Sequence, residues 1–364
     1  MRQLFINGRF LAGAVTAVNT VALDLSCALA KATQNGTAGW NVTLAVPPDL
    51  QEQACATGLA VKVVGRRNGI LWEQTELLHL ARQGVIAGFF NTVPMRGKGH
   101  VTMLHDAQVF TTPGSYKAAT RMWRQTLARR AAASGNYVLT VSEHSKQALL
   151  GVGLGAADQI GVVPNGLGQV GHTIPDAAIL KRLSLTKGAR WSVALATVLP
   201  HKNIRLLLQA FADPALQDHK LILVGRSDAQ DFAAAGMSVS PNVIFAGFVS
   251  DAELAALYRG ASSVCVPSTQ EGFGLPALEG MAQGAPVLAA DCAALPEVLG
   301  GAGWILPHDQ STAWVQALGV LSTDPGRRAA LSAAGRARAA QFTWGAAAAR
   351  TLEHLDRWFP GAEA

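Results

Sequence analysis

The sequence predicts an α/β protein of two domains, each with a parallel sheet covered by helices on both faces. Short strand-like runs alternate with longer helix-like runs from the N-terminus onward, which is typical of parallel βαβ units. The run Pro164-Asn165-Gly166 breaks this alternation, and it restarts near Trp191. The 364 residues, with 49% hydrophobic and 15% charged residues, suit two ordinary hydrophobic cores and argue against disorder.

The first alternation covers residues 1–163. It opens with a strand at Leu4–Ile6, a glycine-bearing loop at Asn7–Gly13 and a helix at Thr16–Lys31. Further strands are expected at Asn41–Val46, Ala60–Val64, Val85–Phe90, Val101–Leu104, Tyr137–Val141 and Gln159–Val163. Further helices are expected at Leu71–Arg82, Tyr116–Ala133 and Ser145–Leu150.

A glycine-rich and polar stretch from Pro164 to about Lys187 is the expected domain junction. Beyond it, strands are expected at Trp191–Ala196, Lys220–Val224, Val243–Phe245, Val264–Val266 and Val287–Ala290. Helices are expected at Asn203–Phe211, Asp251–Arg259, Pro276–Ala282, Thr312–Leu321, Arg327–Gln341 and Trp344–Trp358. We therefore expect domains at residues 1–170 and 171–342, followed by a C-terminal helix within 343–364.

The net charge of +6 is unevenly distributed. Residues 1–170 hold 15 Lys and Arg against 8 Asp and Glu, whereas residues 171–364 hold 15 against 16. A basic first half suggests an anionic partner, although chance surface composition explains it equally well. In the helix expected at Tyr116–Ala133, Trp123 lies among four arginines: Arg121, Arg124, Arg129 and Arg130. This composition suits a helix that lies against anionic lipid headgroups. The alternative is an ordinary amphipathic helix with a solvated basic side.

Two further features bear on location and metal binding. No charge-free apolar run reaches 18 residues, and the N-terminus reads as a strand and turn, so we expect neither a membrane span nor a signal peptide. The cysteines are scattered among apolar residues, so we expect them to be reduced packing residues of a cytoplasmic protein. They show no CxxC or Cys/His metal spacing, so we expect no metal site. They are Cys27, Cys55, Cys265 and Cys292.

The stretch from Ser268 to Gly280 carries the strongest chemical signal. Glu271 and Glu279 flank a Gly-Phe-Gly turn that precedes a helix-like run. Glycines and free N–H groups at a helix start attract anions, and two carboxylates can accept hydrogen bonds from several hydroxyls of one ligand. This combination predicts a nucleotide-sugar site.

With Gly284-Ala-Pro286-Val and Leu295-Pro296-Glu297-Val298, this stretch resembles the retaining glycosyltransferases of family 4, and in particular bacterial mannosyltransferases. The family has the GT-B fold, in which two Rossmann-like domains face a central cleft and a C-terminal helix crosses back to the first domain. The resemblance continues through five other segments: Thr102–Asp106, Leu139–Ser145, Val162–Gly166, Thr197–Asn203 and Asn242–Val249.

The resemblance implies roles for the second-domain residues. Glu279 would bind the ribose hydroxyls and Glu271 would face the donor sugar. Lys202, just before a helix, would hold the diphosphate and stabilise it as the leaving group. The backbone N–H groups that would contact sugar hydroxyls or phosphate belong to Phe273, Gly274 and Leu275.

Other expected site residues are less regular. His201 replaces the family's usual arginine, which removes a bidentate phosphate contact, and Arg205 or Arg226 could compensate. In the first domain, Gly13 would let phosphates approach the backbone. His105 would lie near the transferred sugar, so the expected catalytic residues are His105, Glu271 and Lys202.

The implied activity is retaining transfer of a hexose from a nucleoside-diphosphate sugar to a hydroxyl of a glycan or a polyprenyl-diphosphate-linked acceptor. The second domain would bind the donor and the first the acceptor, in the biosynthesis of surface polysaccharide such as lipopolysaccharide. No metal or other cofactor is expected. GDP-mannose is the favoured donor, with UDP-glucose and dTDP-rhamnose open, and the expected location is the cytoplasm or the inner face of the plasma membrane.

Other classes of protein are the alternatives to a glycosyltransferase. A non-catalytic sugar-nucleotide-binding protein and a GT-B epimerase or phosphorylase would share the fold. An NAD-dependent dehydrogenase would need G-x-G-x-x-G after a strand, and neither half has it. A nucleic-acid-binding role lacks any recognised motif, so no nucleic-acid partner is expected.

Overall fold

The structure, a computed structural model, describes residues 1–13, 16–36, 38–112, 114, 116–133, 135–185 and 188–360. The chain divides into two compact units. The first combines Met1–Gly166 with Phe342–Ala364, and the second is Leu167–Gln341. Each unit contains one parallel sheet between helices, so the expected α/β class is confirmed.

The sheet of the first unit has seven parallel strands among the described residues, in the order β3-β2-β1-β4-β5-β6-β7. Their bounds are β1 Arg2–Asn7, β2 Trp40–Val46, β3 Val61–Val63, β4 Val85–Gly88, β5 His100–Met103, β6 Tyr137–Thr140 and β7 Ile160–Val162. The order reverses between β1 and β4, whose carboxyl ends therefore border the place where ligands gather in Rossmann-like sheets.

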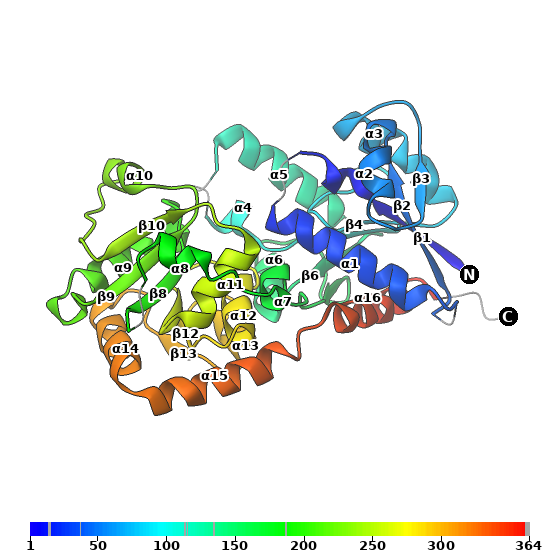
Figure 1. Cartoon of the computed structure of the whole chain (residues 1–364). Helices are drawn as coiled ribbons and strands as arrows, with labels where there is room; N and C mark the ends of the chain where they lie inside the picture. Colours follow the sequence, from blue (N-terminus) through cyan, green and yellow to red (C-terminus); the bar gives the residue numbers. More distant parts are fainter. Residues whose placement is uncertain are drawn as a thin grey trace. The chain divides into compact units, whose positions relative to one another are not determined.

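Helices flank this sheet, as Figure 1 shows. They are α1 (Ala17–Thr33), α2 (Gln51–Cys55), α3 (Gly69–Thr75), α4 (Gln108–Thr111), α5 (Ala118–Ala131), α6 (Glu143–Gly151) and α16 (Trp344–Trp358), with 3₁₀ turns η1 (Gly8–Leu11), η2 (Pro48–Leu50) and η3 (Leu77–Arg82). Thr16 begins α1, because its hydroxyl accepts a hydrogen bond from the N–H of Asn19.

The C-terminal helix α16 belongs to the first unit, as expected, and lies beside α1 (Figure 1). Its Trp358 ring stacks on Tyr137 with ring centroids 4.7 Å apart. Its Asp356 carboxylate accepts a hydrogen bond from the indole of Trp40 at 2.8 Å and pairs with Arg2. These contacts tie the end of the chain to three strands of the first sheet.

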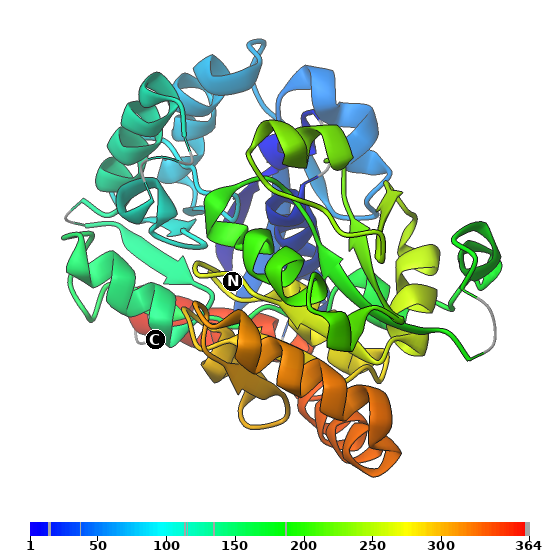
Figure 2. The ribbon, with the colours of Figure 1, turned by 90° about the vertical axis from the view of Figure 1, so that its left-hand side faces the viewer.

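The sheet of the second unit has six parallel strands among the described residues, in the order β10-β9-β8-β11-β12-β13 (Figure 2). The strands are β8 Arg190–Leu195, β9 His219–Val224, β10 Val243–Gly247, β11 Ser263–Val266, β12 Val287–Ala290 and β13 Trp304–Leu306. The order reverses between β8 and β11.

The helices of the second unit lie between and after these strands. They are α7 (Gln169–His172), α8 (Ala178–Arg182), α9 (Ile204–Phe211), α10 (Ala229–Ala234), α11 (Asp251–Gly260), α12 (Leu275–Ala282), α13 (Leu295–Leu299), α14 (Ser311–Thr323) and α15 (Pro325–Ala339), with 3₁₀ turns η5 (Pro200–Lys202) and η6 (Pro214–Leu216). In α9, six of the eight residues are buried, and the helix packs beside α14.

Some sequence-based expectations of local structure were wrong. The loop expected at Asn7–Gly13 contains the 3₁₀ turn η1, and the helix expected at Leu71–Arg82 is divided into α3 and η3. The division falls at Glu76, whose carboxylate accepts hydrogen bonds from the backbone N–H groups of Arg66 and Arg67. The expected junction contains α7 and α8, and four short helices and one strand were not predicted: α2, α4, α10, α13 and β13.

The cysteine expectation was also partly wrong. Cys265 is buried, as a packing residue should be, but Cys55 is exposed, and Cys27 and Cys292 are half-buried. Among the described helices, none combines the length and apolar character needed to cross a bilayer.

Candidate functional site

Two charged side chains meet where the strand order of the second sheet reverses. Lys202 lies in the loop after β8 and Glu271 in the loop after β11, and these strands are neighbours. The Lys202 Nζ lies 2.7 Å from Oε1 of Glu271, with the side chains 28% and 12% exposed. The parallel register therefore brings together two residues that are 69 positions apart in the sequence.

Backbone contacts hold these two loops in place. Asn203, in a left-handed conformation with φ of +53°, directs its side-chain amide to the carbonyls of Pro267 and His308, at 3.1 and 2.8 Å. The N–H of Thr269 donates to the carbonyl of His201 at 2.9 Å. The Lys202–Glu271 pair is thus supported on both sides by fixed main chain.

Two helices begin beside this pair without side-chain caps. Asn203 precedes α9 and Gly274 precedes α12, and neither start receives a side-chain cap hydrogen bond from the described residues. Gly274 has a φ of +103°, and a Cβ there would lie 2.8 Å from a methyl group of Leu295, so only glycine fits. Uncapped helix starts leave backbone N–H groups for an anionic ligand.

Glu279 lies on α12, apart from the ion pair. Partial burial, and secondarily the nearby charge of Asp251, raise the pKa of Glu279 to about 8. The phenol oxygen of Tyr258 is buried nearby without a hydrogen-bond partner in the described structure, and the charge of Glu279 helps to raise its pKa. Gly168 leaves the space that the Glu279 carboxyl occupies, because a Cβ there would collide with Oε1. A largely protonated carboxyl and a buried phenol therefore lie near each other in the second unit.

The basic residues expected to bind phosphate have different surroundings. His201 is only 9% exposed, so its ring is not a surface group. Arg205 donates to the carbonyls of Ala235 and Gly236 at the end of α10, at 3.1 and 3.0 Å. Arg226 is exposed just beyond β9. Of the two arginines that could replace the family's usual one, Arg226 is the one not engaged by a helix end.

The first unit contains a cavity of about 710 Å³ where its own strand order reverses. It lies beyond the carboxyl ends of β1, β4 and β5. Its aromatic lining includes Phe10, Phe90, Phe110, Tyr116 and Trp123, and its polar lining includes Arg9, Asn91, Thr92, His105, Asp106 and Arg124. Aromatic walls with a few fixed polar groups are typical of small-molecule sites.

His105 is one of the fixed polar groups of this cavity. Its ring Nε2 lies 2.9 Å from the carbonyl of Phe89, which assigns the ring proton to Nε2. Burial lowers the pKa of His105, so the ring is neutral near pH 7. The remaining ring nitrogen, Nδ1, can only accept a hydrogen bond from a ligand in this state.

Sequence analysis missed an anchored arginine in the same cavity. The guanidinium of Arg9 donates from Nε to Oε2 of Glu73 at 2.9 Å and stacks over Phe90, and Glu73 is 1% exposed. Asn7 also donates to this carboxylate, at 2.7 Å. A glutamate in a helix is normally exposed, so only the fold could show that Glu73 is buried and holds Arg9 in one position.

The remaining predicted residues have simpler environments. Gly13 is exposed with a φ of +85°, and a Cβ there would meet nothing within 4 Å. Phe273 is 5% exposed, and Leu275 is the first residue of α12. The structure thus joins Lys202 to Glu271, places Glu279 on the following helix, and places His105 and Gly13 in the first unit.

In helix α5, the most exposed side is not the one that carries Arg121 and Gln125. The face shared by Arg121 and Gln125 is half-buried, since the Gln125 amide donates to the carbonyl of Val109. Its solvent-exposed side instead includes Met122, at 68%, and Trp123, at 40%. Arg124 and Arg129 lie over the rings of Tyr116 and Phe110.

Two Rossmann-like units, each with polar groups at the point where the strand order reverses, define a class of two-domain α/β proteins that bind ligands at the carboxyl edges of their sheets. Residues 191–324 match the family described as Glycosyl transferases group 1. The chain is 30% identical over 301 residues to O-antigen chain mannosyltransferase B of Escherichia coli, covering 77% of this chain and 78% of that protein.

Two further likenesses agree. MMP alpha-(1->4)-mannosyltransferase of Mycolicibacterium hassiacum is 30% identical over 303 residues, covering 78% of this chain and 68% of that protein. The structure of Anabaena HepE in complex with UDP and glucose has a TM-score of 0.70 at 20% identity, covering 98% of this chain and all of that one, and this likeness concerns the fold alone. The chain belongs to the group 1 glycosyltransferases: it is a transferase with the GT-B fold.

Proposed function

We propose that this glycosyltransferase moves a hexose, with retention of anomeric configuration, from a nucleoside-diphosphate sugar to a hydroxyl of a glycan or a polyprenyl-diphosphate-linked glycan. The observation that carries this proposal is the Lys202–Glu271 ion pair, at 2.7 Å, beside two uncapped helix starts. A cation and free N–H groups suit a diphosphate, and the adjacent carboxylate suits the hydroxyls of a sugar.

In the proposed donor complex, Lys202 and the N–H groups of Gly274 and Leu275 bind the diphosphate. Glu271 turns one carboxylate oxygen to the sugar hydroxyls while it keeps its contact with Lys202. Glu279 accepts hydrogen bonds from the ribose hydroxyls, for which it must lose its proton. Arg226, exposed at the same edge of the sheet, supplies the phosphate contact that His201 does not.

The proposed transfer breaks the bond between the sugar C1 and the diphosphate oxygen, and the pair of bonding electrons leaves with the diphosphate. The acceptor oxygen forms its bond to C1 on the same face. Its proton passes to the departing diphosphate oxygen. Lys202 and the helix N–H groups lower the barrier by stabilising the charge that develops on the leaving group. The reaction as proposed uses no cofactor besides the donor.

We propose that the cavity of the first unit takes the acceptor. Sugar rings pack well on aromatic faces such as Phe90, Tyr116 and Trp123, and Asn91 and Thr92 can orient hydroxyls. His105 is proposed to touch the substrate as a neutral acceptor through Nδ1, because Nε2 is engaged by Phe89.

The proposed donor sugar is mannose, carried by GDP, and the proposed pathway is the biosynthesis of surface polysaccharide. This is supported by two mannosyltransferases among the relatives, one of which acts on an O-antigen chain by its name. UDP-glucose and dTDP-rhamnose are the alternative donors.

A thermal-shift panel with GDP-mannose, UDP-glucose, UDP-N-acetylglucosamine, dTDP-rhamnose and NAD tests donor binding. We expect one sugar nucleotide to raise the melting temperature, and Lys202→Ala and Glu279→Ala to abolish the rise. Sugar transfer to a lipid-linked acceptor then tests catalysis. Stabilisation only by NAD, or equal stabilisation of both variants, would show that the donor site is wrong. Donor binding without turnover on any acceptor would favour a non-catalytic binding protein.

We also propose that the exposed side of α5 contacts an anionic membrane surface, where a lipid-linked acceptor would lie. Met122 and Trp123 supply apolar contacts, and Arg124 and Arg130 supply positive charge. The double variant Arg124→Glu/Arg130→Glu should bind vesicles containing anionic lipid at least about tenfold more weakly, given about 1 kcal/mol per basic residue. Equal binding of the variant and the unaltered protein would contradict this proposal.

A further inference from the structure

A second group of reactive side chains lies at the carboxyl edge of the second sheet. Asp291 directly follows β12, and His308 lies two residues beyond the end of β13. The two strands are parallel neighbours, with Ala290 opposite Leu306, and the N–H of Asp291 donates to the carbonyl of Leu306 at 2.9 Å. The register of these strands therefore fixes the two loops side by side.

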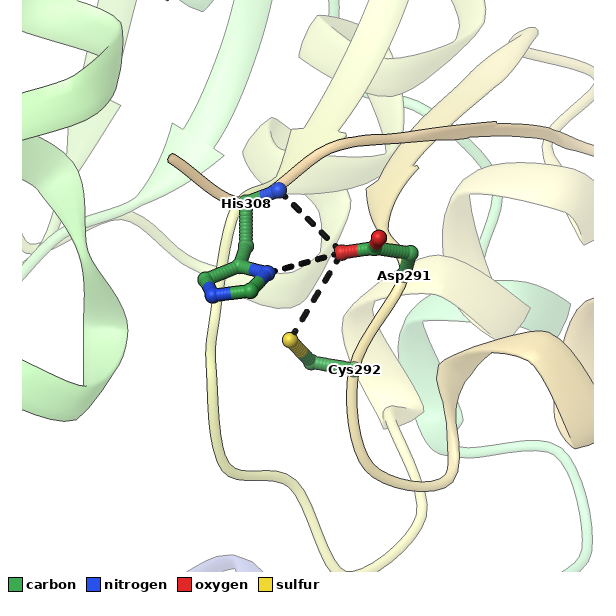
Figure 3. A group of neighbouring side chains, drawn as sticks. All are labelled: Asp291, Cys292 and His308. Carbon is green, nitrogen blue, oxygen red and sulfur yellow. Dashed lines mark hydrogen bonds and ion pairs between the residues drawn. The ribbon is translucent and has the colours of Figure 1, made fainter. Parts of the chain in front are cut away.

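Three side chains from these loops point toward one another, as Figure 3 shows. Oδ1 of Asp291 lies 2.9 Å from Nδ1 of His308 and 3.8 Å from Sγ of Cys292. The backbone N–H of His308 donates to the same oxygen at 3.1 Å. Together the three residues offer one oxygen, one nitrogen and one sulfur atom, all within 4.8 Å of one another.

This arrangement is unsuited to nucleophilic catalysis by the cysteine. The His308 ring faces Asp291, so it cannot take the proton of the Cys292 thiol. The Cys292 thiol instead points to the carboxylate, with Sγ donating toward Oδ1 of Asp291 at 3.8 Å. A carboxylate between a thiol and an imidazole favours a bound cation instead.

We propose that Asp291, Cys292 and His308 bind a divalent transition-metal ion, and that zinc fits this set of ligands best. Zinc accepts mixed sulfur, nitrogen and oxygen ligands at about 2.0–2.3 Å in tetrahedral geometry, which places ligand atoms roughly 3.3–3.8 Å apart. The separations of 2.9 and 3.8 Å lie close to that range, so small side-chain rotations suffice. Magnesium and calcium prefer oxygen alone, so the thiol and imidazole select against them.

The chemistry of binding balances within these residues. The Cys292 thiol releases its proton to solvent as the thiolate binds, and the imidazole proton moves from Nδ1 to Nε2 so that Nδ1 can coordinate. The side chains of Asp291 and His308 are 47% and 45% exposed, so an ion can reach them from water. A water molecule completes the fourth position.

The site adjoins the loop that carries Lys202. The side-chain amide of Asn203, the next residue, donates to the carbonyl of His308 at 2.8 Å. A bound ion would hold the loops after β12 and β13 together and so support the anchor of Asn203. The inferred role is therefore structural reinforcement of this edge of the sheet, and it does not depend on which donor the protein uses.

Metal titration of the tag-free, chelator-treated full chain tests this proposal. We expect one Zn²⁺ per chain by calorimetry, a rise in melting temperature with Zn²⁺, and a thiolate-to-metal absorption band with Co²⁺. Cys292→Ser should abolish the band, and Cys292→Ser and His308→Gln should each weaken Zn²⁺ binding at least about tenfold. Cys55→Ser, which alters the exposed cysteine of the first unit, is the matched control and should change neither result.

Circular dichroism and melting temperature in the presence of chelator establish that each variant is folded before titration. The proposal is overturned if Co²⁺ gives no thiolate band with the unaltered protein. It is equally overturned if folded Cys292→Ser retains the band, or if folded Cys292→Ser and His308→Gln bind Zn²⁺ with unchanged affinity.

Discussion

At the residue scale, the surroundings of Glu279 strongly raise the pKa of its carboxyl. Its pKa of about 8, against an ordinary value of 4.5, results from burial first and from Asp251 second. The same carboxyl must be ionised to accept hydrogen bonds from two ribose hydroxyls. Donor binding and loss of this proton are therefore expected to be coupled.

This coupling predicts a pH dependence of stability in the ligand-free protein. A carboxyl whose pKa is raised in the folded state stabilises the fold fully below pH 4.5, and that stabilisation is lost as the pH rises through about 8. Glu279→Gln cannot ionise, so it should be more stable than the unaltered protein at pH 9, by on the order of 1–3 kcal/mol, and close to it at pH 5. Urea unfolding at both pH values measures this, and an equal difference at the two values would contradict it.

The Lys202–Glu271 pair predicts coupled effects of substitution. The Glu271 side chain is only 12% exposed, and Lys202→Met leaves its carboxylate without a partner. The substitution should therefore lower the free energy of unfolding by about 1–3 kcal/mol. Adding Glu271→Gln should recover part of that loss, because the stranded charge is then removed. A double-mutant cycle by urea denaturation measures the coupling, with Arg350→Met and Glu353→Gln, an exposed pair on α16, as the control of little coupling. Purely additive effects at Lys202 and Glu271 would show that the pair is not an interaction in solution.

At the scale of elements, the start of α12 depends on Gly274. Two independent constraints act there: a φ of +103°, and a neighbouring methyl group of Leu295 at 2.8 Å from any added Cβ. The helix start is also the place where the proposed diphosphate contacts originate. A change at this one residue should therefore alter both stability and donor binding.

We expect Gly274→Ala to lower stability by about 1–2 kcal/mol for the conformation alone, and further for the contact with Leu295. Gly301→Ala is the matched control, since Gly301 also has a positive φ, of +83°, but has open space around its Cβ position. Both variants should be destabilised by the unfavourable backbone conformation. Only Gly274→Ala should also weaken the thermal shift caused by the donor. Thermal melts with and without sugar nucleotide compare them, and an equal response of the two variants would refute the role of the Leu295 contact.

At the scale of the whole molecule, the first unit is discontinuous in sequence. Strands near the N-terminus and the C-terminal helix α16 share a core, through Trp358 on Tyr137 and through Asp356 with Trp40 and Arg2. The second unit is continuous, from Leu167 to Gln341. The end of the chain therefore contributes to the stability of the first unit rather than the second.

Removal of residues 342–364 should consequently destabilise the first unit selectively. Loss of the buried Leu355 and Trp358 side chains alone amounts to roughly 5 kcal/mol or more, by comparison with large-to-alanine substitutions. Limited proteolysis followed by mass spectrometry should find new cleavage within 1–166 and intact chain from 167 to 341. Trp358→Ala should give a weaker form of the same pattern, whereas cleavage confined to the second unit would contradict it.

The sequence by itself determined the class of fold, most strands and long helices, and the residues that carry the donor motif. These follow from local patterns. Hydrophobic residues recur with the short period of strands or the longer period of helices, glycines flank Phe273, and Thr16 caps the start of α1. The short elements α10, α13 and β13 escaped prediction, because tertiary contacts stabilise segments too short to show a period of their own.

Only the tertiary structure decided which distant side chains meet. Parallel strand register brings Lys202 to Glu271, and Asp291 to His308, across loops that no sequence spacing relates. Burial likewise decided the protonation of Glu279 and His105, since the pKa of a carboxyl or imidazole depends on the solvent and charges around it rather than on its sequence neighbours. Local sequence specifies what each segment can form, and the packing of segments determines the chemistry of the groups that they bring together.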